Sequence, residues 1–447
     1  MTLIPPSFVT IKTVHGVEVV EDRVCLVDAL SLELQAIHVS SLSFSPIHPT
    51  EFYLLLPPLT SRRMPFLEEL EIVVQQPSDP KAPYLTVPAM TLPPSNFLLL
   101  QTLRLDGVTL SMSAPFLPSL RHLVLANYPS VEQCMRFIDL MAALESCPNL
   151  EELEMRNYGR VFSLAGDDDP QTRVMLNQLK KFTIDEPTFV VMNLLQYLYI
   201  PPAADIHVTL DYRPAYRHEL VDLHEGLAYI FRVILPERDY VLPILEHVTS
   251  VEAEFGLYSY RLVGETPLTN KLTVEILLSP EEGAVLLPWA FMEPIGIAFH
   301  NSPVMVASFT GDLSGLTDEE WIAGLSALPQ LMKLNVHHTD GSPAPIALPL
   351  FYALRMYPWA GERPPPLPPL AADLENLSVQ GATYSGELLK TVLESLQRRA
   401  AEGTRLHSLW IVMTASESEQ QACMDDIARY GSDLTALTTT GSCWLIA

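Results

Sequence analysis

A histidine–carboxylate cluster is the stretch of this sequence that comes nearest to a metal site. His218, Glu219 and Asp222 approach the H-E-x-x-H pattern of zinc enzymes, with Asp222 in place of the second histidine and His224 close behind. On a helix, His218, Asp222 and Glu225 share one side. The opposite side carries an apolar stripe: Leu220, Leu223, Leu227, Ile230 and Ile234. The pattern therefore favours the solvated side of an amphipathic helix over a metal site.

Other potential sites lack the spacing that their chemistry requires. In the segment 311–315, Ser314 stands one place too late for the G-x-S-x-G turn of a nucleophilic serine. His337-His338 has no third ligand nearby in the sequence, and Asp167–Asp169 lacks the glycine and the spacing of a calcium loop. No phosphate-binding glycine loop occurs. We therefore predict no enzymatic activity, no catalytic residue, no metal and no cofactor.

The composition is that of a folded and strongly acidic protein. The chain has 447 residues, 48% of them hydrophobic, and its 53 acidic and 27 basic residues give a formal charge of −26. Such a surface repels nucleic acid and anionic membrane, so neither is predicted as a partner. The charge suits either a basic protein partner or the simple solubility of a leucine-rich chain.

The cysteines and the N-terminus predict an intracellular protein, either cytoplasmic or nuclear. The 5 cysteines are an odd number without a C-x-x-C pair, which favours a reducing compartment over disulfides or a zinc site. The N-terminal residues lack the basic and apolar runs of a secretion signal. The least polar stretch, residues 294–311, is too interrupted to span a membrane.

A short motif, Pro-x-Leu-x-x-(Leu/Val), recurs along the chain and indicates a repeat architecture. Its copies begin at Pro65, Pro118, Pro148, Pro243 and Pro329. Weaker copies without the proline begin at Leu34, Leu100, Leu179, Leu374 and Leu406. Successive copies are mostly about 30 residues apart, which is enough for a strand, a helix and two loops.

The motif predicts a strand, and the segments between motifs predict helices. The apolar residues at the end of each motif alternate with polar ones, and the proline ends the preceding helix. Capping boxes at Ser130–Gln133 and Thr317–Glu320 and an apolar stripe within residues 386–402 predict helices in between. Because one repeat cannot bury its apolar side alone, neighbours must stack. We predict an α/β leucine-rich-repeat solenoid with a curved parallel sheet inside, helices outside and irregular middle repeats.

The repeat array is expected to span residues 34–413. Residues 1–33 contain two strand-like runs around His15-Gly16 and predict an N-terminal cap that could form a hairpin. Within the array, residues 187–310 are degenerate and residues 358–370 form a proline-rich insertion. Residues 414–447 are expected to form a C-terminal cap, because terminal repeats must cover the core.

The proline-rich insertion contains a spacing that is typical of a binding motif. Arg363, Pro366 and Pro369 match the polyproline-II ligands of SH3-type domains, which present a proline at every third residue. The alternative is a rigid loop between two repeats, since such motifs arise readily by chance in a chain with 39 prolines.

If the strands stack in register, equivalent motif positions lie side by side. This register predicts the rows Arg121–Glu151–Lys180 and His122–Glu152–Lys181. Outward strand positions then form the predicted partner-binding surface, because they are exposed and rigidly held. The candidates are Glu69, Glu71, Arg104, His122, Glu152, Glu154, Arg156, Lys181, Lys333, Asn335 and Trp410. The alternative for the charged residues is that they pair with one another, as Glu152 and Lys181 would.

Three of these candidates carry more weight than the others. Glu71, Glu154 and Trp410 have no obvious partner, either of opposite charge or apolar, in every neighbouring row. Trp410 is the strongest candidate, because exposed tryptophan is enriched at binding hot spots. The alternative is that the segment Leu434–Ala447 covers it.

The chain resembles fungal F-box/leucine-rich-repeat proteins over residues 30–445. The resemblance lies in the proline–leucine motifs, the segment Leu194–Val208 and the helix Leu389–Arg399. It implies a substrate receptor of a cullin ubiquitin ligase, in which an N-terminal F-box binds the ligase adaptor and the repeats hold the substrate. No L-P-x-E-[IVL] opening of an F-box precedes residue 34, so only the recognition half carries over.

The sequence therefore favours a protein-interaction module. It is either a ligase substrate receptor that is missing its F-box or a free-standing scaffold, and an in-frame F-box encoded upstream of Met1 would decide between them. A truncated product without a partner remains as an alternative. An enzyme whose site is assembled from scattered residues is disfavoured, because no set of reactive residues converges.

Overall fold

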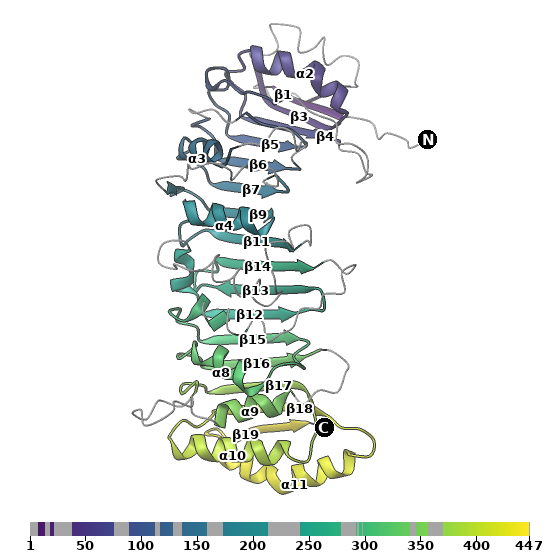
Figure 1. The fold of residues 1–447 in the computed structure, drawn as a ribbon, viewed down its shortest axis with the longest axis vertical. Helices are drawn as coiled ribbons and strands as arrows, with labels where there is room; N and C mark the ends of the chain where they lie inside the picture. Colours follow the sequence, from purple (N-terminus) through teal and green to yellow (C-terminus); the bar gives the residue numbers. More distant parts are fainter. Residues whose placement is uncertain are drawn as a thin grey trace. The chain divides into compact units, whose positions relative to one another are not determined.

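The computed structural model describes residues 8–13, 18–21, 38–75, 89–111, 117–127, 136–158, 173–212, 242–278, 292, 295–296, 298–339, 346–355 and 370–446. The chain divides into two compact units, unit 1 (Met1–Leu210) and unit 2 (Asp211–Ala447). Each unit combines helices with a large, mostly parallel set of strands (Figure 1).

Unit 1 is built on strands that follow one another in the sequence and pair in parallel. In order they are β3 (Val39–Ile47), β4 (Glu69–Val74), β5 (Thr102–Asp106), β6 (His122–Ala126), β7 (Glu152–Arg156), β9 (Lys181–Glu186) and β11 (Asp205–Tyr212). The short strands β8 (Val174–Met175) and β10 (Leu198–Tyr199) form a separate parallel pair.

Two antiparallel strands precede β3 in unit 1. The strand β1 (Phe8–Thr13) pairs antiparallel with β2 (Glu18–Glu21) and with β3. These strands coincide with the runs that were expected to form an N-terminal hairpin. That they cap the repeat array stays a prediction.

Alternate positions of the unit 1 strands form continuous buried ladders. Leu70, Leu103, Leu123 and Leu153 are neighbours in register, and each is at most 1% exposed. A second buried ladder lies two residues further along: Ile72, Leu105, Leu125, Met155 and Ile184. Burial of one such side chain contributes about 1.5–3 kcal/mol, so these ladders supply much of the stability of the sheet.

The register of the strands agrees with the spacing of the motifs. His122 lies opposite Glu152, and Glu152 lies opposite Lys181. The predicted row His122–Glu152–Lys181 is therefore confirmed.

A tight turn precedes these strands and gives the proline of the motif a second role. The backbone N–H of Leu120 donates to the carbonyl of Leu117, and that of Leu150 donates to the carbonyl of Cys147, each at 3.1 Å. Pro118 therefore occupies the second position of a β-turn, where the fixed φ of proline is favoured. Pro65, Pro148 and Pro329 occupy the same position in their own turns.

In unit 2 the parallel pattern runs to the end of the described chain. The strand β12 (Ser250–Phe255) pairs with β15 (Val306–Gly311), and the order continues through β16 (Lys333–His338), β17 (Asn376–Thr383), β18 (Ser408–Thr414) and β19 (Ser442–Ile446). The strand β19 comes from the segment expected to cap the array, and it adds a parallel strand beside β18.

An antiparallel meander interrupts this parallel order, so the prediction of one parallel sheet needs correction. The strand β13 (Ser259–Glu265) pairs antiparallel with β12 and with β14 (Lys271–Leu278). Only short turns join these strands, whereas parallel neighbours need a crossover of about a dozen residues or more. No copy of the repeat motif marks β13, which is why the spacing argument missed it.

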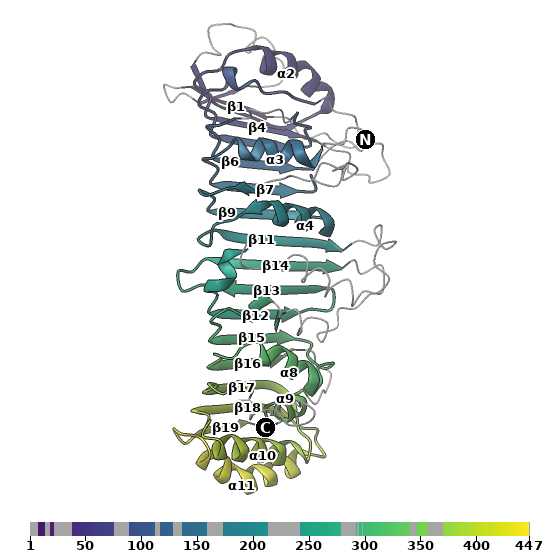
Figure 2. The same cartoon turned by 60° about the vertical axis from the view of Figure 1, so that its left-hand side comes forward.

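Helices lie over one face of the strands in each unit (Figure 2). Unit 1 contains α2 (Pro49–Ser61), α3 (Phe137–Glu145) and α4 (Thr188–Tyr197), and a 3-10 turn, η2 (Pro94–Asn96). Unit 2 contains α8 (Asp318–Ser326), α9 (Ala347–Arg355), α10 (Leu388–Ala401) and α11 (Gln420–Ala436), and a 3-10 turn, η5 (Pro243–His247). In unit 2 the helices α8 to α11 pack side by side in chain order.

The ends of the helices agree with the sequence signals in unit 2. Thr317 and Glu320 form the expected capping box at the start of α8, where the Thr317 N–H donates to Glu320 Oε2 at 2.7 Å. The helix α10 ends just before Gly403, whose φ of +83° suits a helix stop. In unit 1 the described helix α3 begins only at Phe137, after an extended Arg136.

Some predicted features lie outside the described residues. They are the N-terminal capping box at Ser130–Gln133, the acidic run at Asp167–Asp169, the cluster of His218, Asp222 and His224, and the proline-rich segment with Arg363, Pro366 and Pro369. Among the helices that the structure does describe, none has both the length and the apolar character that a membrane crossing demands.

Candidate functional site

The outward side chains of the unit 1 strands form a charged surface, which we call the unit 1 face. It consists of Ser41, Ser43, Glu69, Glu71, Val73, Thr102, Arg104, Asp106, His122, Val124, Glu152, Glu154, Arg156, Lys181, Thr183, Asp185, Asp205 and His207. These residues alternate with the buried ladder positions, because successive side chains of a strand point to opposite faces. Acidic residues outnumber basic ones in this set, so the face carries a net negative charge. All the predicted partner-binding residues of unit 1 belong to it.

Two acidic residues of the unit 1 face that were expected to lack partners are in fact paired. Glu71 accepts a hydrogen bond from Ser43 Oγ (2.7 Å) and lies 3.3 Å from Nε of Arg104, its register neighbour on β5. Glu154 lies 2.8 Å from Nε of Arg156, two residues further along the same strand. The expectation was therefore wrong for Glu71, which has a counter-charge in the neighbouring row. The rows beside Glu154 hold Val124 and Thr183, so its partner lies along its own strand instead. Exposed pairs of this kind contribute at most about 1 kcal/mol, so a partner can displace them at low cost.

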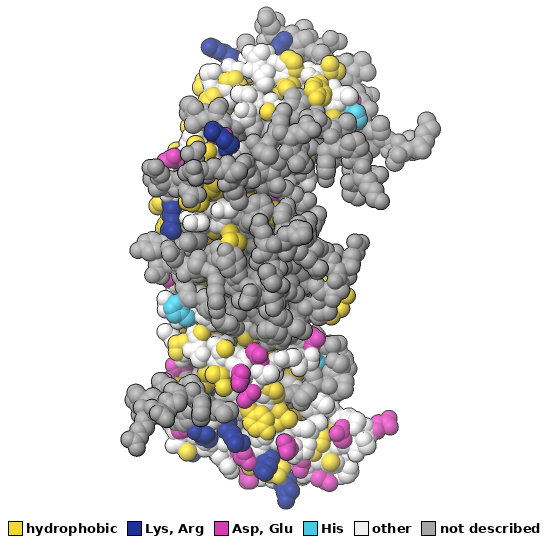
Figure 3. All heavy atoms as spheres, viewed as in Figure 1, with side chains coloured by type: hydrophobic (Ala, Val, Ile, Leu, Met, Phe, Trp, Pro, Cys, Tyr) yellow, Lys and Arg dark blue, Asp and Glu magenta, His cyan; other side chains and the backbone are white. Residues whose placement is uncertain are grey.

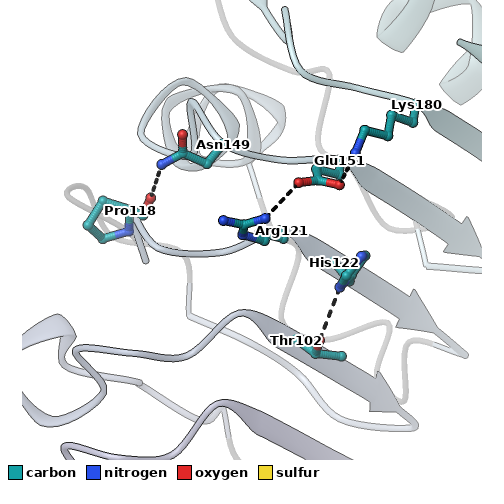
Figure 4. Close-up of polar contacts among 7 residues, drawn as sticks. All are labelled: Thr102, Pro118, Arg121, His122, Asn149, Glu151 and Lys180. Carbon is teal, nitrogen blue, oxygen red and sulfur yellow. Dashed lines mark hydrogen bonds and ion pairs between the residues drawn. The ribbon is translucent and has the colours of Figure 1, made fainter.

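A second charged row crosses the turns that precede the strands (Figure 4). Arg121 Nη1 lies 3.0 Å from Glu151 Oε1, and Lys180 Nζ lies 2.5 Å from Glu151 Oε2. The hydrogen bond from Lys180 is the main cause that lowers the pKa of Glu151. In the adjacent row, His122 Nδ1 and Thr102 Oγ1 lie 3.1 Å apart. The predicted row Arg121–Glu151–Lys180 is confirmed, and its two cations share one carboxylate, so the row keeps a net charge of +1.

The last five parallel strands of unit 2, β15 to β19, present a surface of different chemistry, which we call the unit 2 face. The parallel strand β12 beside β15 is not part of it, because its outward residues Glu252 and Glu254 are acidic. The unit 2 face consists of the outward residues of β15 to β19: Val306, Ser308, Thr310, Lys333, Asn335, His337, Asn376, Ser378, Gln380, Ser408, Trp410, Val412, Ser442, Trp444 and Ile446. Within this set only Lys333 carries a permanent charge. Asn335, a predicted partner-binding residue, donates through Nδ2 to Ser308 Oγ on the adjacent strand at 3.0 Å.

Trp410 is exposed, and a second tryptophan lies beside it. Trp410 is 39% exposed, and the segment Leu434–Ala447 flanks it through Trp444 of β19 without covering it. Trp444 is 59% exposed, and the two ring centroids are 6.1 Å apart with an interplanar angle of 36°. The expectation that Trp410 has no apolar partner was therefore wrong, because its register neighbour is aromatic.

The importance of Trp444 was missed in the sequence, although a signal for it exists. Residues 408–412 read Ser-Leu-Trp-Ile-Val, and residues 442–446 read Ser-Cys-Trp-Leu-Ile. Alignment of these two five-residue segments puts the tryptophans in register. The motif search overlooked the second strand because a cysteine replaces the leucine.

The reactive residues singled out in unit 2 serve structural roles. His338 is buried and accepts through Nδ1 from the Leu313 N–H at 3.2 Å, whereas His337 is exposed on the opposite side of the same strand. These two histidines therefore cannot share a ligand. Ser314 Oγ donates to Asp312 Oδ1 at 2.7 Å in the turn after β15. Gly311 opens that turn, since a Cβ there would lie 2.0 Å from the carbonyl oxygen of Phe255.

The buried polar side chains of the described core include one arginine and one glutamate, which were not anticipated. Arg399 of α10 is 1% exposed, and its guanidinium donates to the carbonyls of Leu370 and Ala371 at 3.0 Å each. Glu186 is equally buried and accepts from the Tyr158 N–H at 2.6 Å. Arg399 holds the segment before β17 to the helix α10, and Glu186 holds the segment after β7 to the strand β9. Both side chains therefore have a structural role.

The helical face of unit 2 offers charges that are already matched. Acidic and basic side chains mingle over α10 and α11 (Figure 3). Arg355 lies 2.5 Å from Glu394, and Arg398 lies 3.4 Å from Glu402. Across the described parts of both units, no group of three or more His, Cys, Asp or Glu side chains is arranged to hold a metal ion. The two strand faces are therefore the strongest candidates for a functional surface.

Comparison of the sequence with protein-family models finds no matching family, and comparison with curated proteins finds no match either. The candidate surface is consequently argued from the geometry of this chain alone.

Proposed function

We propose that this chain is a protein-interaction module of the leucine-rich-repeat solenoid type, and that its strand faces bind the partner. The observation that carries this proposal is the unit 1 face. Consecutive parallel strands there present equivalent outward side chains in rows, above ladders of fully buried leucines. Such a surface is rigid and can be varied at each outward position without loss of the core, as recognition by repeat proteins requires.

The net negative charge of the unit 1 face favours a partner with a basic surface. Charge complementarity speeds association and makes it dependent on salt. Glu69 and Glu152 are exposed members of this face. They supply the negative potential that would attract such a partner.

The finer proposal is that this module is the substrate-recognition part of an F-box-type ubiquitin ligase receptor. It is supported by the resemblance of the repeats and by the availability of the strand faces. An F-box, in a segment upstream of this chain, would then bind the cullin ligase adaptor. The alternative is a free-standing scaffold without a role in a ligase, and binding of the adaptor by the natural full-length protein separates the two.

A charge-reversal experiment tests the role of the unit 1 face. The chain carrying both Glu69→Lys and Glu152→Lys should lose the protein that wild type captures from cells of its source. A control with Glu417→Lys and Asp425→Lys makes the same change in net charge on exposed residues at and before α11. The control should retain the partner. Equal retention by both variants would show that the unit 1 face does not bind it.

A further inference from the structure

We propose that the exposed pair Trp410 and Trp444 is a binding site for a proline-rich segment of a partner protein in the polyproline-II conformation, with an arginine that contacts Glu375. This site lies in unit 2 and is separate from the unit 1 face. Its failure would leave the charge-reversal experiment on unit 1 unaffected, so the two proposals can be judged separately.

The geometry of the two indoles suits stacking of proline rings. The two rings lie side by side on adjacent strands, with centroids 6.1 Å apart and an interplanar angle of 36°, so they present one contiguous aromatic surface. Val412 and Ile446 lie two residues further along the same strands and extend the apolar surface. Proline-rich segments bind to aromatic-lined surfaces of this kind, because the polyproline-II helix is already ordered before binding.

The immediate neighbours of the tryptophans favour uncharged groups of the ligand at the indoles themselves. Their neighbours across and along the strands are Ser378, Ser408 and Ser442, which are neutral and polar. A partner that presented acidic or basic side chains here would lose their hydration without gaining a counter-charge. A polyproline-II segment brings proline rings and backbone carbonyls, and the hydroxyl groups of the half-buried Ser378 and Ser442 can donate to such carbonyls, whereas that of Ser408 donates to Asn376 Oδ1.

One carboxylate lies at a distance that matches the arginine of such a segment. Glu375 precedes β17, and its carbonyl accepts from the N–H of His407, which places Glu375 in the row before the strands. Trp410 is three residues beyond His407, or about 10 Å along a strand. In an R-x-x-P segment the arginine and the proline are also three residues apart, which is about 9 Å in a polyproline-II helix. An arginine can therefore reach Glu375 while the proline lies on the indoles. The carboxylate of Glu375 is 41% exposed, and its Oε2 lies 3.6 Å from Nδ1 of His407, which the arginine would join or replace as its partner.

The chain itself supplies the probe for the experiment. Its residues 363–369 read Arg-Pro-Pro-Pro-Leu-Pro-Pro, which has the required spacing. A fluorescently labelled peptide of this sequence is titrated into the full chain, and binding is measured by anisotropy. We expect saturable binding, at least tenfold weaker binding to Trp444→Ala, and loss of binding when the peptide carries alanine in place of the prolines that correspond to Pro366 and Pro369. Glu375→Gln should weaken the binding of this peptide but not of one with alanine in place of its arginine.

Two controls keep the result interpretable. Leu268→Ala removes a side chain of unit 2 that is 79% exposed and lies outside the unit 2 face, so it should bind the peptide as wild type does. Circular dichroism and urea unfolding should show that Trp444→Ala folds normally, because that side chain is exposed. Absence of binding, or equal binding by Trp444→Ala and Leu268→Ala, overturns the proposal. So does binding only by a chain with Pro366→Ala and Pro369→Ala, since the site would then hold the chain's own segment.

Discussion

The side chain of Arg399 holds the segment of chain that leads into strand β17. Its guanidinium donates to the carbonyls of Leu370 and Ala371, just before β17. Burial lowers the pKa of this guanidinium to about 10, so the site tolerates the cation only because the carbonyls are there. A buried carbonyl that loses its donor costs about 1–3 kcal/mol.

We therefore expect Arg399→Met to lower the free energy of unfolding by about 2 kcal/mol or more, measured in urea. Arg398→Met is the matched control, since Arg398 is 45% exposed and pairs with Glu402 on the helix surface. The control should cost less than about 1 kcal/mol. Similar losses in the two variants would contradict the structural role of Arg399.

The buried thiol of Cys147 makes the free energy of unfolding depend on pH, and its contribution can be measured separately from that of other groups. Burial raises the pKa of its thiol to about 12 from an ordinary 9.0. Below pH 9 both states keep the proton and the effect is absent. Between pH 9 and 12 the unfolded chain loses the proton while the folded chain retains it, so stability falls as the pH rises, by at most about 1.4 kcal/mol per pH unit.

The comparison of wild type with Cys147→Ala separates this thiol from other groups. From pH 8 to pH 10, under reducing conditions, the stability advantage of wild type should shrink by about 1 kcal/mol. The measurement is urea unfolding at both values of pH. An advantage that stays constant would mean that the thiol is accessible to water in the folded chain.

At the scale of the strands, the residue that follows β6 controls how the chain leaves the sheet. Asn127 has a φ of +49°, and Gly107 has a φ of +70° at the equivalent place after β5. The Asn127 N–H donates to the carbonyl of Arg156, which ties the exit of one strand to the next. Asparagine and glycine adopt this left-handed conformation at lower cost than other residues.

Glycine and alanine variants at Asn127 and at a position inside a strand test whether the positive φ of Asn127 affects stability. Asn127→Gly should be more stable than Asn127→Ala by about 1 kcal/mol, because alanine is strained at positive φ. At Arg104, inside β5, the alanine variant should instead be more stable than the glycine variant, since glycine loses more entropy there. Urea unfolding of the four variants provides the measurement. If the same variant, glycine or alanine, were the more stable one at both positions, the positive φ of residue 127 would not be a source of strain.

The elements show where sequence reasoning succeeds and where it stops. The motif places Leu70, Leu103, Leu123 and Leu153 in register because strands of one length and one spacing leave a single way to bury their leucines. It misses β13, because a strand within a meander pairs through short turns and needs no repeat. It also misses the Glu154–Arg156 pair, because that pair runs along one strand and a row alignment does not encode it. The Glu71–Arg104 pair, in contrast, joins register neighbours, and alignment of the two motifs would have given it.

The candidate surface, too, could be predicted from the sequence only in part. The outward positions could be predicted from alternation alone. The contrast between a charged unit 1 face and a neutral, aromatic unit 2 face required the register of β18 and β19, because Trp444 acquires its meaning only beside Trp410.

At the scale of the molecule, the proposed repeat architecture predicts that one repeat can be removed if the register is respected. The turn Leu176–Leu179 is equivalent to the turn Cys147–Leu150. Deletion of Pro148–Leu176 should therefore place β9 beside β6 and retain cooperative unfolding at a lower midpoint. Deletion of Pro148–Ile184 also removes most of β9, and should cost much more stability, because each repeat supports its neighbours.

Circular dichroism and urea unfolding of the two deletions decide this prediction. Stability equal to that of wild type in both would contradict stacking of neighbours. Complete unfolding of both would mean that the strands of unit 1 do not behave as interchangeable repeats.

The antiparallel meander has a consequence for the order in which unit 2 folds. Phe255 pairs with Tyr260 and Glu265 with Lys271, whereas Ser250 pairs with Val306 across a far longer stretch of chain. Closing a short loop costs less entropy, and hairpins form within about 1–10 μs, so local pairings precede distant ones. We expect the amides of β13 to gain protection from hydrogen exchange before those of β15 in a pulse-labelling experiment during refolding. The irregular part of the sheet would then be the template on which the regular parallel strands assemble.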